Sequence, residues 1–312
     1  MGLMKILYKY MPFRLSFFDD PLLRLTPPSD LNDPFDSKPT QAGIEKKIKF
    51  FFDDRDDRDD LEDAEAESGI RAAYEKDLRS GLDRFGIISL TEDPYNLLMW
   101  SHYAAEHKGL VVSISCDSST FEYHDKFTEI CGVSKLKPTR VKYSNMRPGY
   151  QMPDSTIYEY FEHNFYTHFA MTKGNDWIYE KEYRYLLRLA EADVAIADIN
   201  LPSWASSQGA GIRITHLYDN SYKIEAACVE KRDLLPWVLA FAQGRSEISN
   251  VKLFKRLKEN SITGIYFGSR ASEENILRAR DKIEKSSMFG QSVTFHRSIE
   301  SQDRFEINFE KL

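Results

Sequence analysis

The chain has 312 residues, of which 42% are hydrophobic, 29% are charged and 13% are aromatic. This length and balance are typical of a globular protein with a sizeable core, and they exclude a fibrous or wholly disordered chain. The net charge of −7 arises in one segment, Asp53–Glu67, which holds ten acidic residues and two arginines. The rest of the chain is close to neutral, and no basic run predicts tight general binding to nucleic acid.

Cysteine usage and hydropathy bear on location. The three cysteines are widely spaced and form no CxxC pair, which argues against a disulfide framework or zinc ribbon and fits a reducing cytoplasm. No apolar run approaches the roughly 18 residues that a membrane span needs, and the N-terminus lacks the apolar core of a secretory signal. We therefore expect a cytoplasmic protein without membrane contact or a resident metal.

The first 90 residues predict strands that alternate with helices. The expected strands are Ile6–Tyr10, Leu22–Thr26 and Gly86–Leu90, and the expected helices are Ile44–Phe52 and Ile70–Leu82. Pro27 and Pro28 should end the second strand because proline cannot donate to a ladder. The acidic run between the helices is expected to form a solvated helix or a mobile loop, since like charges at this density repel.

The middle of the chain predicts a helix that Asp93-Pro94 opens and Gly109 closes. The strand Leu110–Ser115 follows it, and an aromatic helix is expected within residues 150–175. Tyr183–Leu189 reads YRYLLRL, which is typical of a strand. The stretch 191–222 is expected to be irregular.

Beyond residue 222, helical and strand patterns alternate. The expected elements are strand Lys223–Glu230, helices Leu234–Ala242 and Glu247–Asn260, strand Ile262–Phe267, helix Ser272–Lys285 and strand Val293–Arg297. The whole pattern predicts an α+β fold with a central mixed β-sheet flanked by helices. We expect a core domain over residues 1–190, with an acidic helical insertion at 41–85, and a C-terminal α/β portion over 191–312 packed on the same sheet.

One candidate site lies in the segment 177–189, WIYEKEYRYLLRL. Alternate side chains of a strand share a face, so Glu180, Glu182 and Arg184 should lie together. Two carboxylates beside an arginine can form a tuned acid–base group or stabilise a cation. The alternative is an exposed sheet face with ordinary ion pairs, which contribute little.

Two further motifs carry polar side chains that could bind a ligand. Asn32-Asp33-Pro34-Phe35-Asp36 follows the second strand; such a sequence commonly builds a turn, but sites are also assembled on loops of this kind. In Trp100-Ser101-His102-Tyr103, His102 lies beside the apolar stripe of the predicted helix and could face a cleft. An ordinary core or surface histidine is the alternative.

Motifs of several large enzyme classes are absent from the sequence: there is no P-loop, dinucleotide-binding glycine fingerprint, zincin helix or nucleophile elbow. One metal hypothesis stays open. Asp30, Asp33 and Asp36, together with Glu182, could offer oxygen ligands to magnesium.

Taken in order, the motifs resemble the domain of unknown function 2971 family of bacteria. They are Leu7-Tyr8-Lys9-Tyr10, the Asn32–Asp36 motif, Trp100–Tyr103 with His107-Lys108-Gly109, Trp177–Arg184 and Ile265-Tyr266-Phe267-Gly268. The similarity spans most of residues 5–270. The resemblance implies a cytosolic protein of mobile or defence-related loci.

A looser similarity, in the order of the elements, is to mono-ADP-ribosyltransferase-like folds, which implies NAD as a substrate. This resemblance implies that Glu182 stabilises the oxocarbenium-like ribose as the nicotinamide bond breaks, and that Glu180 orients the acceptor. Tyr10 and Tyr103 would flank the nicotinamide. Lys9 would partly replace the usual first-strand histidine or arginine, without arginine's bidentate fork.

Three hypotheses of function follow. The first is an NAD-consuming, ADP-ribosyltransferase-like toxin or phage-defence effector that acts on a macromolecular acceptor or hydrolyses NAD, with Lys9, Asn32 and His102 beside the carboxylates. The second is a non-enzymatic module that binds a ligand or an operon-encoded protein partner through Asn32, Asp33, His102 and Arg184. The third is a metal-dependent nuclease.

Overall fold

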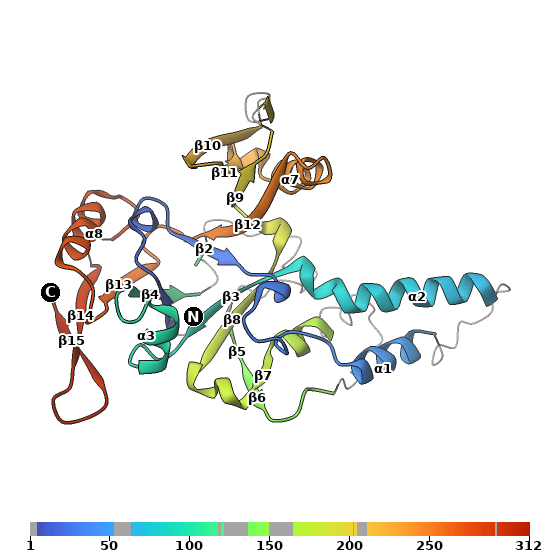
Figure 1. Ribbon diagram of the computed structural model, residues 1–312, viewed down its shortest axis with the longest axis horizontal. Coiled ribbons are helices and arrows are strands. Elements are labelled where there is room, and N and C mark those ends of the chain that lie inside the picture. The colour runs from blue at the N-terminus through green and yellow to red at the C-terminus, as the bar shows by residue number, and fades with distance from the viewer. Residues whose placement is uncertain are drawn as a thin grey trace.

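The computed structural model describes residues 5–52, 64–117, 120–121, 137–149, 165–201, 203–204, 211–290 and 292–312 (Figure 1). Within these ranges the protein is mixed α+β, as predicted. An eight-stranded mixed sheet curls into a half-barrel, and a five-stranded antiparallel sheet lies beside it.

The eight-stranded sheet has the order β15-β14-β13-β4-β1-β3-β8-β5. Its strands are β1 (Lys5–Met11), β3 (Phe85–Thr91), β4 (Leu110–Cys116), β5 (Thr139–Arg140), β8 (Glu182–Arg188), β13 (Ile262–Phe267), β14 (Thr294–Glu300) and β15 (Ile307–Lys311). Only β13 and β14 pair in parallel, and every other neighbouring pair is antiparallel. This arrangement makes the sheet mixed.

The pairing of β1 is strongly uneven. Along one edge β1 pairs with β4 continuously from Lys5 to Met11. Along its other edge it pairs with β3 at a single position, where Tyr8 lies opposite Thr91. The ladder between β1 and β3 therefore stops after one residue pair, and the sheet opens there.

The five-stranded sheet has the order β10-β11-β9-β12-β2. Its strands are β2 (Leu22–Leu25), β9 (Val194–Ile199), β10 (Ile212–Tyr218), β11 (Ser221–Ala226) and β12 (Ile248–Arg256). A β-bridge between Thr26 and Ile87 ties the end of β2 to β3. A separate parallel pair is formed by β6 (Lys142–Ser144) and β7 (Thr172–Gly174).

The helices lie against the two sheets or extend from them. They are α1 (Gln41–Phe52), α2 (Ala64–Ser80), α3 (Leu97–Tyr103), α7 (Leu234–Gly244) and α8 (Glu273–Lys285), with the 3-10 turns η1 (Leu15–Phe18), η2 (Pro28–Asp30), η3 (Gly81–Arg84), η4 (Asn175–Glu180), η5 (Leu189–Glu191) and η6 (Val229–Lys231). Trp100 of α3 is fully buried beside Tyr10 of β1, while Ile276, Ala279 and Ile283 of α8 join the main apolar core. In Figure 1, α1 and α2 lie side by side and extend away from the sheets.

The structure corrects the prediction for residues 247–260, because this stretch forms strand β12 and not a helix. The strand lies between β9 and β2, so pairing on both edges satisfies its backbone. The stretch 191–222 is also more regular than expected, since it contains β9 and β10. The run VAIADI of β9 is typical of a buried strand.

The helix predicted to end at Gly109 ends earlier, at Tyr103. Ala105, Glu106 and His107 have φ values of 48°, 55° and 66°, so the chain turns through three left-handed residues before β4. Two other predictions lie partly outside the described residues. They concern positions 53–63 of the acidic run and 150–164 of the aromatic helix.

The predicted division at residue 190 stays a prediction. Strands from beyond this residue occur in both sheets: β13, β14 and β15 belong to the eight-stranded sheet, and β9 to β12 join β2 in the other. Within the described residues, no helix has the length and apolar character to cross a membrane.

Candidate functional site

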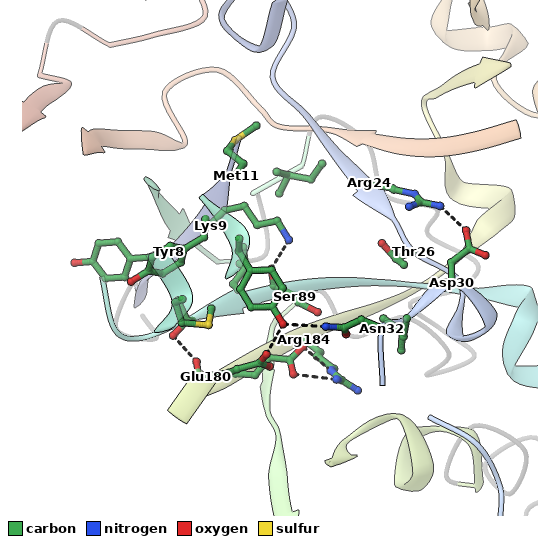
Figure 2. Close-up of a pocket in the computed structure, with 18 of the residues that line it drawn as sticks. Tyr8, Lys9, Met11, Arg24, Thr26, Asp30, Asn32, Ser89, Glu180 and Arg184 are labelled. Carbon is green, nitrogen blue, oxygen red and sulfur yellow. Dashed lines mark hydrogen bonds and ion pairs between the residues drawn. The ribbon is translucent and has the colours of Figure 1, made fainter. Parts of the chain in front are cut away.

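A cavity of about 510 Å³ lies where the sheet opens between β1 and β3 (Figure 2). Its lining comes from β1, β3 and β8 of the eight-stranded sheet and from β2 and β12 of the other sheet. The loop after β2, the end of α3 and residues of β7 and η4 complete it. This volume falls in the range of small-molecule sites, roughly 300–1,000 Å³.

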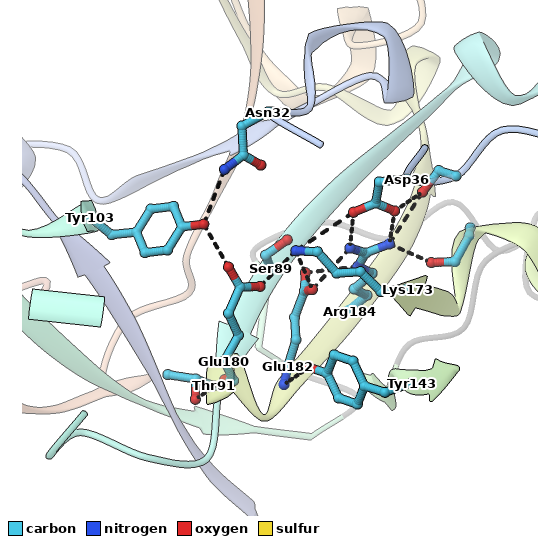
Figure 3. A network of polar contacts seen from close by, with 12 residues as sticks. Asn32, Asp36, Ser89, Thr91, Tyr103, Tyr143, Lys173, Glu180, Glu182 and Arg184 are labelled. Carbon is cyan, nitrogen blue, oxygen red and sulfur yellow. Dashed lines mark hydrogen bonds and ion pairs between the residues drawn. The ribbon is translucent and has the colours of Figure 1, made fainter. Parts of the chain in front are cut away.

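Arg184 organises a buried charged cluster at one wall of this cavity (Figure 3). Its Nη1 and Nη2 atoms donate to the two oxygens of Asp36 at 2.8 and 2.6 Å. Its Nε and Nη2 atoms donate to the two oxygens of Glu182 at 2.7 and 2.9 Å. Further bonds run from Nη1 to the carbonyl of Ala170 and the hydroxyl of Ser37. Such bidentate, charge-assisted bonds fix both carboxylates in place.

Lys173 of β7 lies among the same carboxylates. Its Nζ is 2.6 Å from Glu180 Oε2, 3.4 Å from Glu182 Oε2 and 3.7 Å from Asp36 Oδ2. Burial alone would lower the pKa of Lys173, but the charges of Glu182 and Glu180 outweigh it and leave that pKa raised. Burial would raise the pKa of Glu182, whereas Arg184 and Lys173 hold it at about 2. This ammonium and this carboxylate are therefore both charged at neutral pH.

Glu180 connects the cluster to the open part of the cavity. Its Oε1 accepts a hydrogen bond of 2.6 Å from the Tyr103 hydroxyl, and that hydroxyl accepts one of 3.2 Å from Asn32 Nδ2. Burial and the adjacent Glu180 raise the pKa of Tyr103, so the phenol stays protonated. Figure 3 shows this chain leading from exposed Asn32 to the buried carboxylates.

Lys9 occupies the opening between β1 and β3. Its Nζ donates to the backbone carbonyl of Ser89 at 2.9 Å, an oxygen that a continuous ladder would satisfy with a backbone amide. Burial lowers the pKa of Lys9, against the opposing charges of Glu182 and Glu180. Among the described residues this is its one hydrogen bond, which leaves donor capacity on the ammonium.

Most of the residues selected from the sequence meet at this cavity. Those that line it are Lys9, Tyr10, Asn32, Tyr103, Glu180, Glu182 and Arg184. Tyr10 serves mainly to anchor the wall, because its ring packs edge-on against Trp100 and its hydroxyl donates to the carbonyl of Asp93.

Asp33 and His102 lie apart from the lining. The buried carboxylate of Asp33 accepts the backbone amide of Phe35 at 2.9 Å, which closes the turn of its motif. His102 is exposed on α3, with its ring 6.5 Å from that of Tyr179. For Asp33 the structure therefore fits the turn-building alternative, and for His102 it fits the alternative of a surface histidine.

Sequence analysis missed Lys173 and assigned Asp36 only to a magnesium hypothesis. The motif around Asp36 gave a usable signal, but nothing in the local sequence marks Lys173, which the fold alone brings to the carboxylates. The magnesium hypothesis gains no support. Asp30 pairs with Arg24, Asp33 caps its own turn and Asp36 pairs with Arg184; among the described positions, no three acidic, histidine or cysteine side chains are grouped to hold a metal ion.

Comparison with known proteins adds one finding. Residues 99–185 match the family model described as Protein of unknown function (DUF2971). The matched segment contains Tyr103, Lys173, Glu180, Glu182 and Arg184, whereas their partners Asn32 and Asp36 lie before it. No curated protein and no solved structure matches the chain.

Proposed function

We propose that the cavity binds a dinucleotide of the NAD type and that the protein cleaves the bond between nicotinamide and ribose. The ADP-ribosyl group would pass to a macromolecular acceptor or to water. An ADP-ribosyltransferase-like core is part of the same proposal, as are a cytoplasmic location and a role as a toxin or phage-defence effector. The observation that carries the chemistry is the Glu180 carboxylate, held by Tyr103 and Lys173 at a cavity of nucleotide size.

The chemistry needs a fixed negative charge. As the C–N bond breaks, nicotinamide leaves with the bonding electron pair and positive charge develops on the ribose. A preorganised carboxylate stabilises that charge in a site from which water is largely excluded. The acceptor oxygen or nitrogen then bonds to the ribose carbon and gives its proton to solvent.

The contacts favour Glu180 over Glu182 for the residue that meets the ribose. Both oxygens of Glu182 already accept from the Arg184 guanidinium. The oxygens of Glu180 accept from a neutral phenol and from Lys173, and its neighbour Tyr103 is only partly buried. We assign Glu182 to holding Lys173 and Arg184, so the role at the ribose that the resemblance implied for Glu182 passes to Glu180.

The test is nicotinamide release from NAD by purified protein, compared with Glu180→Gln. We expect this variant to lose at least about a hundredfold in rate, in the range for removing one electrostatic stabiliser. Glutamine keeps the shape of the side chain but loses the buried ion pair with Lys173, so the melting temperature should fall while the variant stays folded at the assay temperature, which circular dichroism checks. Glu106→Gln, which changes an exposed glutamate beside Lys108, is the matched control. Equal rates in wild type and Glu180→Gln would refute the proposal.

One observation favours a non-enzymatic binding module as a second candidate. Three cations of the cluster face three anions, and each of these side chains has a partner inside the protein; they are Lys9, Lys173 and Arg184, and Asp36, Glu180 and Glu182. A balanced, rigid wall can recognise a ligand without reacting with it. Saturable NAD binding with less than one equivalent of product per protein would favour this candidate.

A further inference from the structure

The mouth of the cavity carries cations that lack partners. Arg14, which follows β1, and Lys252 of β12 both line the cavity and are exposed. Within the described part of the chain, neither side chain makes a hydrogen bond or an ion pair. They differ in this from the cations of the buried wall, whose charges are met by carboxylates.

Arg24 adds a third cation on the same side. Its Nη2 pairs with Asp30, but its Nε is buried and has no hydrogen-bond partner in the described structure. The Arg24 side chain as a whole is 35% exposed and lines the cavity, so a ligand there can reach its guanidinium. Figure 2 shows Arg24 beside Asp30, on a different strand from Lys9.

Strand register puts Arg24 and Lys252 on one face of the five-stranded sheet, and Arg14 reaches the same cavity from the loop after β1. Arg24 pairs directly with Phe254, and directly opposed residues in an antiparallel pair point to the same face. Lys252 lies two residues from Phe254 and shares this face. Arg24, Lys252 and Phe254 all line the cavity, so an aromatic residue neighbours both cations on this face.

The lining as a whole is positive. It contains six cationic and four anionic side chains, an excess of two positive charges in a protein whose net charge is −7. The cations are Lys9, Arg14, Arg24, Lys173, Arg184 and Lys252, and the anions are Asp30, Asp36, Glu180 and Glu182. The excess matches a ligand that carries about two negative charges.

We propose that Arg14, Arg24 and Lys252 form a subsite for the diphosphate of a nucleotide. Arginine forks bind phosphate oxygens in a bidentate manner, and a lysine ammonium adds a point charge. Phe254 offers apolar contact beside the phosphates. The subsite rests on the proposed function only in taking NAD as the nucleotide, because the cationic face would hold the diphosphate of ADP in the same way.

Calorimetric titration of the whole protein with inorganic pyrophosphate, ADP and ADP-ribose tests this subsite. Lys252→Gln and Arg14→Gln change exposed side chains, so both variants should fold normally. We expect each to weaken ADP binding about tenfold, and we expect binding by the wild type to weaken at high salt. Lys258→Gln, at an exposed lysine outside the cavity lining, is the matched control and should bind as the wild type does.

The possible outcomes separate the two proposals. ADP binding that falls in Lys252→Gln and Arg14→Gln, without any nicotinamide release by the wild type, supports the subsite and removes the NAD-cleaving function. Nicotinamide release with an unchanged KM for NAD in both variants overturns the subsite and leaves the function standing. Tighter binding of a single-stranded oligonucleotide than of ADP also overturns the subsite.

Discussion

Two buried ionic clusters in this protein look alike but differ in their surroundings. The first, around Arg184 and Lys173, lines the cavity. The second lies around Lys255 of β12, which is fully buried and donates to the carbonyl of Glu191 at 2.6 Å and to Asp193 at 3.4 Å. The second cluster is not part of the cavity lining.

The pKa values of the two lysines are shifted in opposite directions. The pKa of Lys173 is raised because Glu182 and Glu180 outweigh its burial. The pKa of Lys255 is lowered because burial outweighs Asp193 and Glu191. Burial and ion pairing are common to both clusters, so they do not by themselves mark a ligand site. The position of the first cluster on the wall of an open cavity is what distinguishes it from the second.

The largest effect is expected from Arg184→Met. This change leaves Asp36 and Glu182 buried without their shared partner, which should lower the free energy of unfolding by about 4 kcal/mol. Urea denaturation measures it. Arg140→Met, which removes an exposed pair with Glu92, is the control and should cost less than about 1 kcal/mol. A loss of similar size in both variants would contradict the central role of Arg184.

Acid should weaken the first cluster through Glu182. Its folded-state pKa of about 2 lies below the usual 4.5, so the unfolded chain binds this proton first as the pH falls. The stabilisation is therefore complete above about pH 4.5 and is lost as the pH approaches 2, by roughly 3 kcal/mol. Unfolding free energies of wild type and Glu182→Gln across this range measure it. A wild-type curve with the same slope as that of the variant would rule out this origin.

Lys255→Met should have a smaller effect, about 2 kcal/mol of unfolding free energy. Methionine fills the space but removes a donor from the Glu191 carbonyl, while Asp193 keeps Arg232 as a charged partner. Binding of ADP should not change, because the second cluster lies outside the cavity lining. Urea denaturation and calorimetric titration give the two readouts. Loss of ADP binding by a folded Lys255→Met protein would contradict the claim that only the first cluster belongs to the ligand site.

Tyr103→Phe is expected to have the smallest effect on stability. It removes the hydroxyl that joins Asn32 to Glu180, at a cost of about 1 kcal/mol. Nicotinamide release should fall more clearly than stability, because Glu180 loses the group that orients it. Thermal melting and the rate assay, run on one preparation, compare the two losses. An unchanged rate would place Tyr103 outside the reaction.

Most of the residues at the site could be predicted from the sequence, but Lys173 and Lys252, which also line the cavity, could not. Glu182 and Arg184 share a strand, so their alternation could be read directly. Glu180 belongs to the turn η4, just before that strand, yet its side chain still reaches the cluster. The structure corrected the helix predicted over residues 247–260, which had hidden the place of Lys252 on the cavity. Lys173 could not be found either, since its role depends on where β7 and β8 are placed by distant segments.

The single residue pair between β1 and β3 has a consequence for how a ligand is recognised. Past Tyr8 and Thr91, the facing edges of these strands are not paired with each other, and Lys9 takes the place of one missing amide. Main-chain atoms thus border the opening, and a ligand can be bound by backbone amide and carbonyl groups. Contacts to main-chain atoms survive side-chain substitution, so part of the ligand selectivity would depend on the backbone conformation and not on the identity of the side chains.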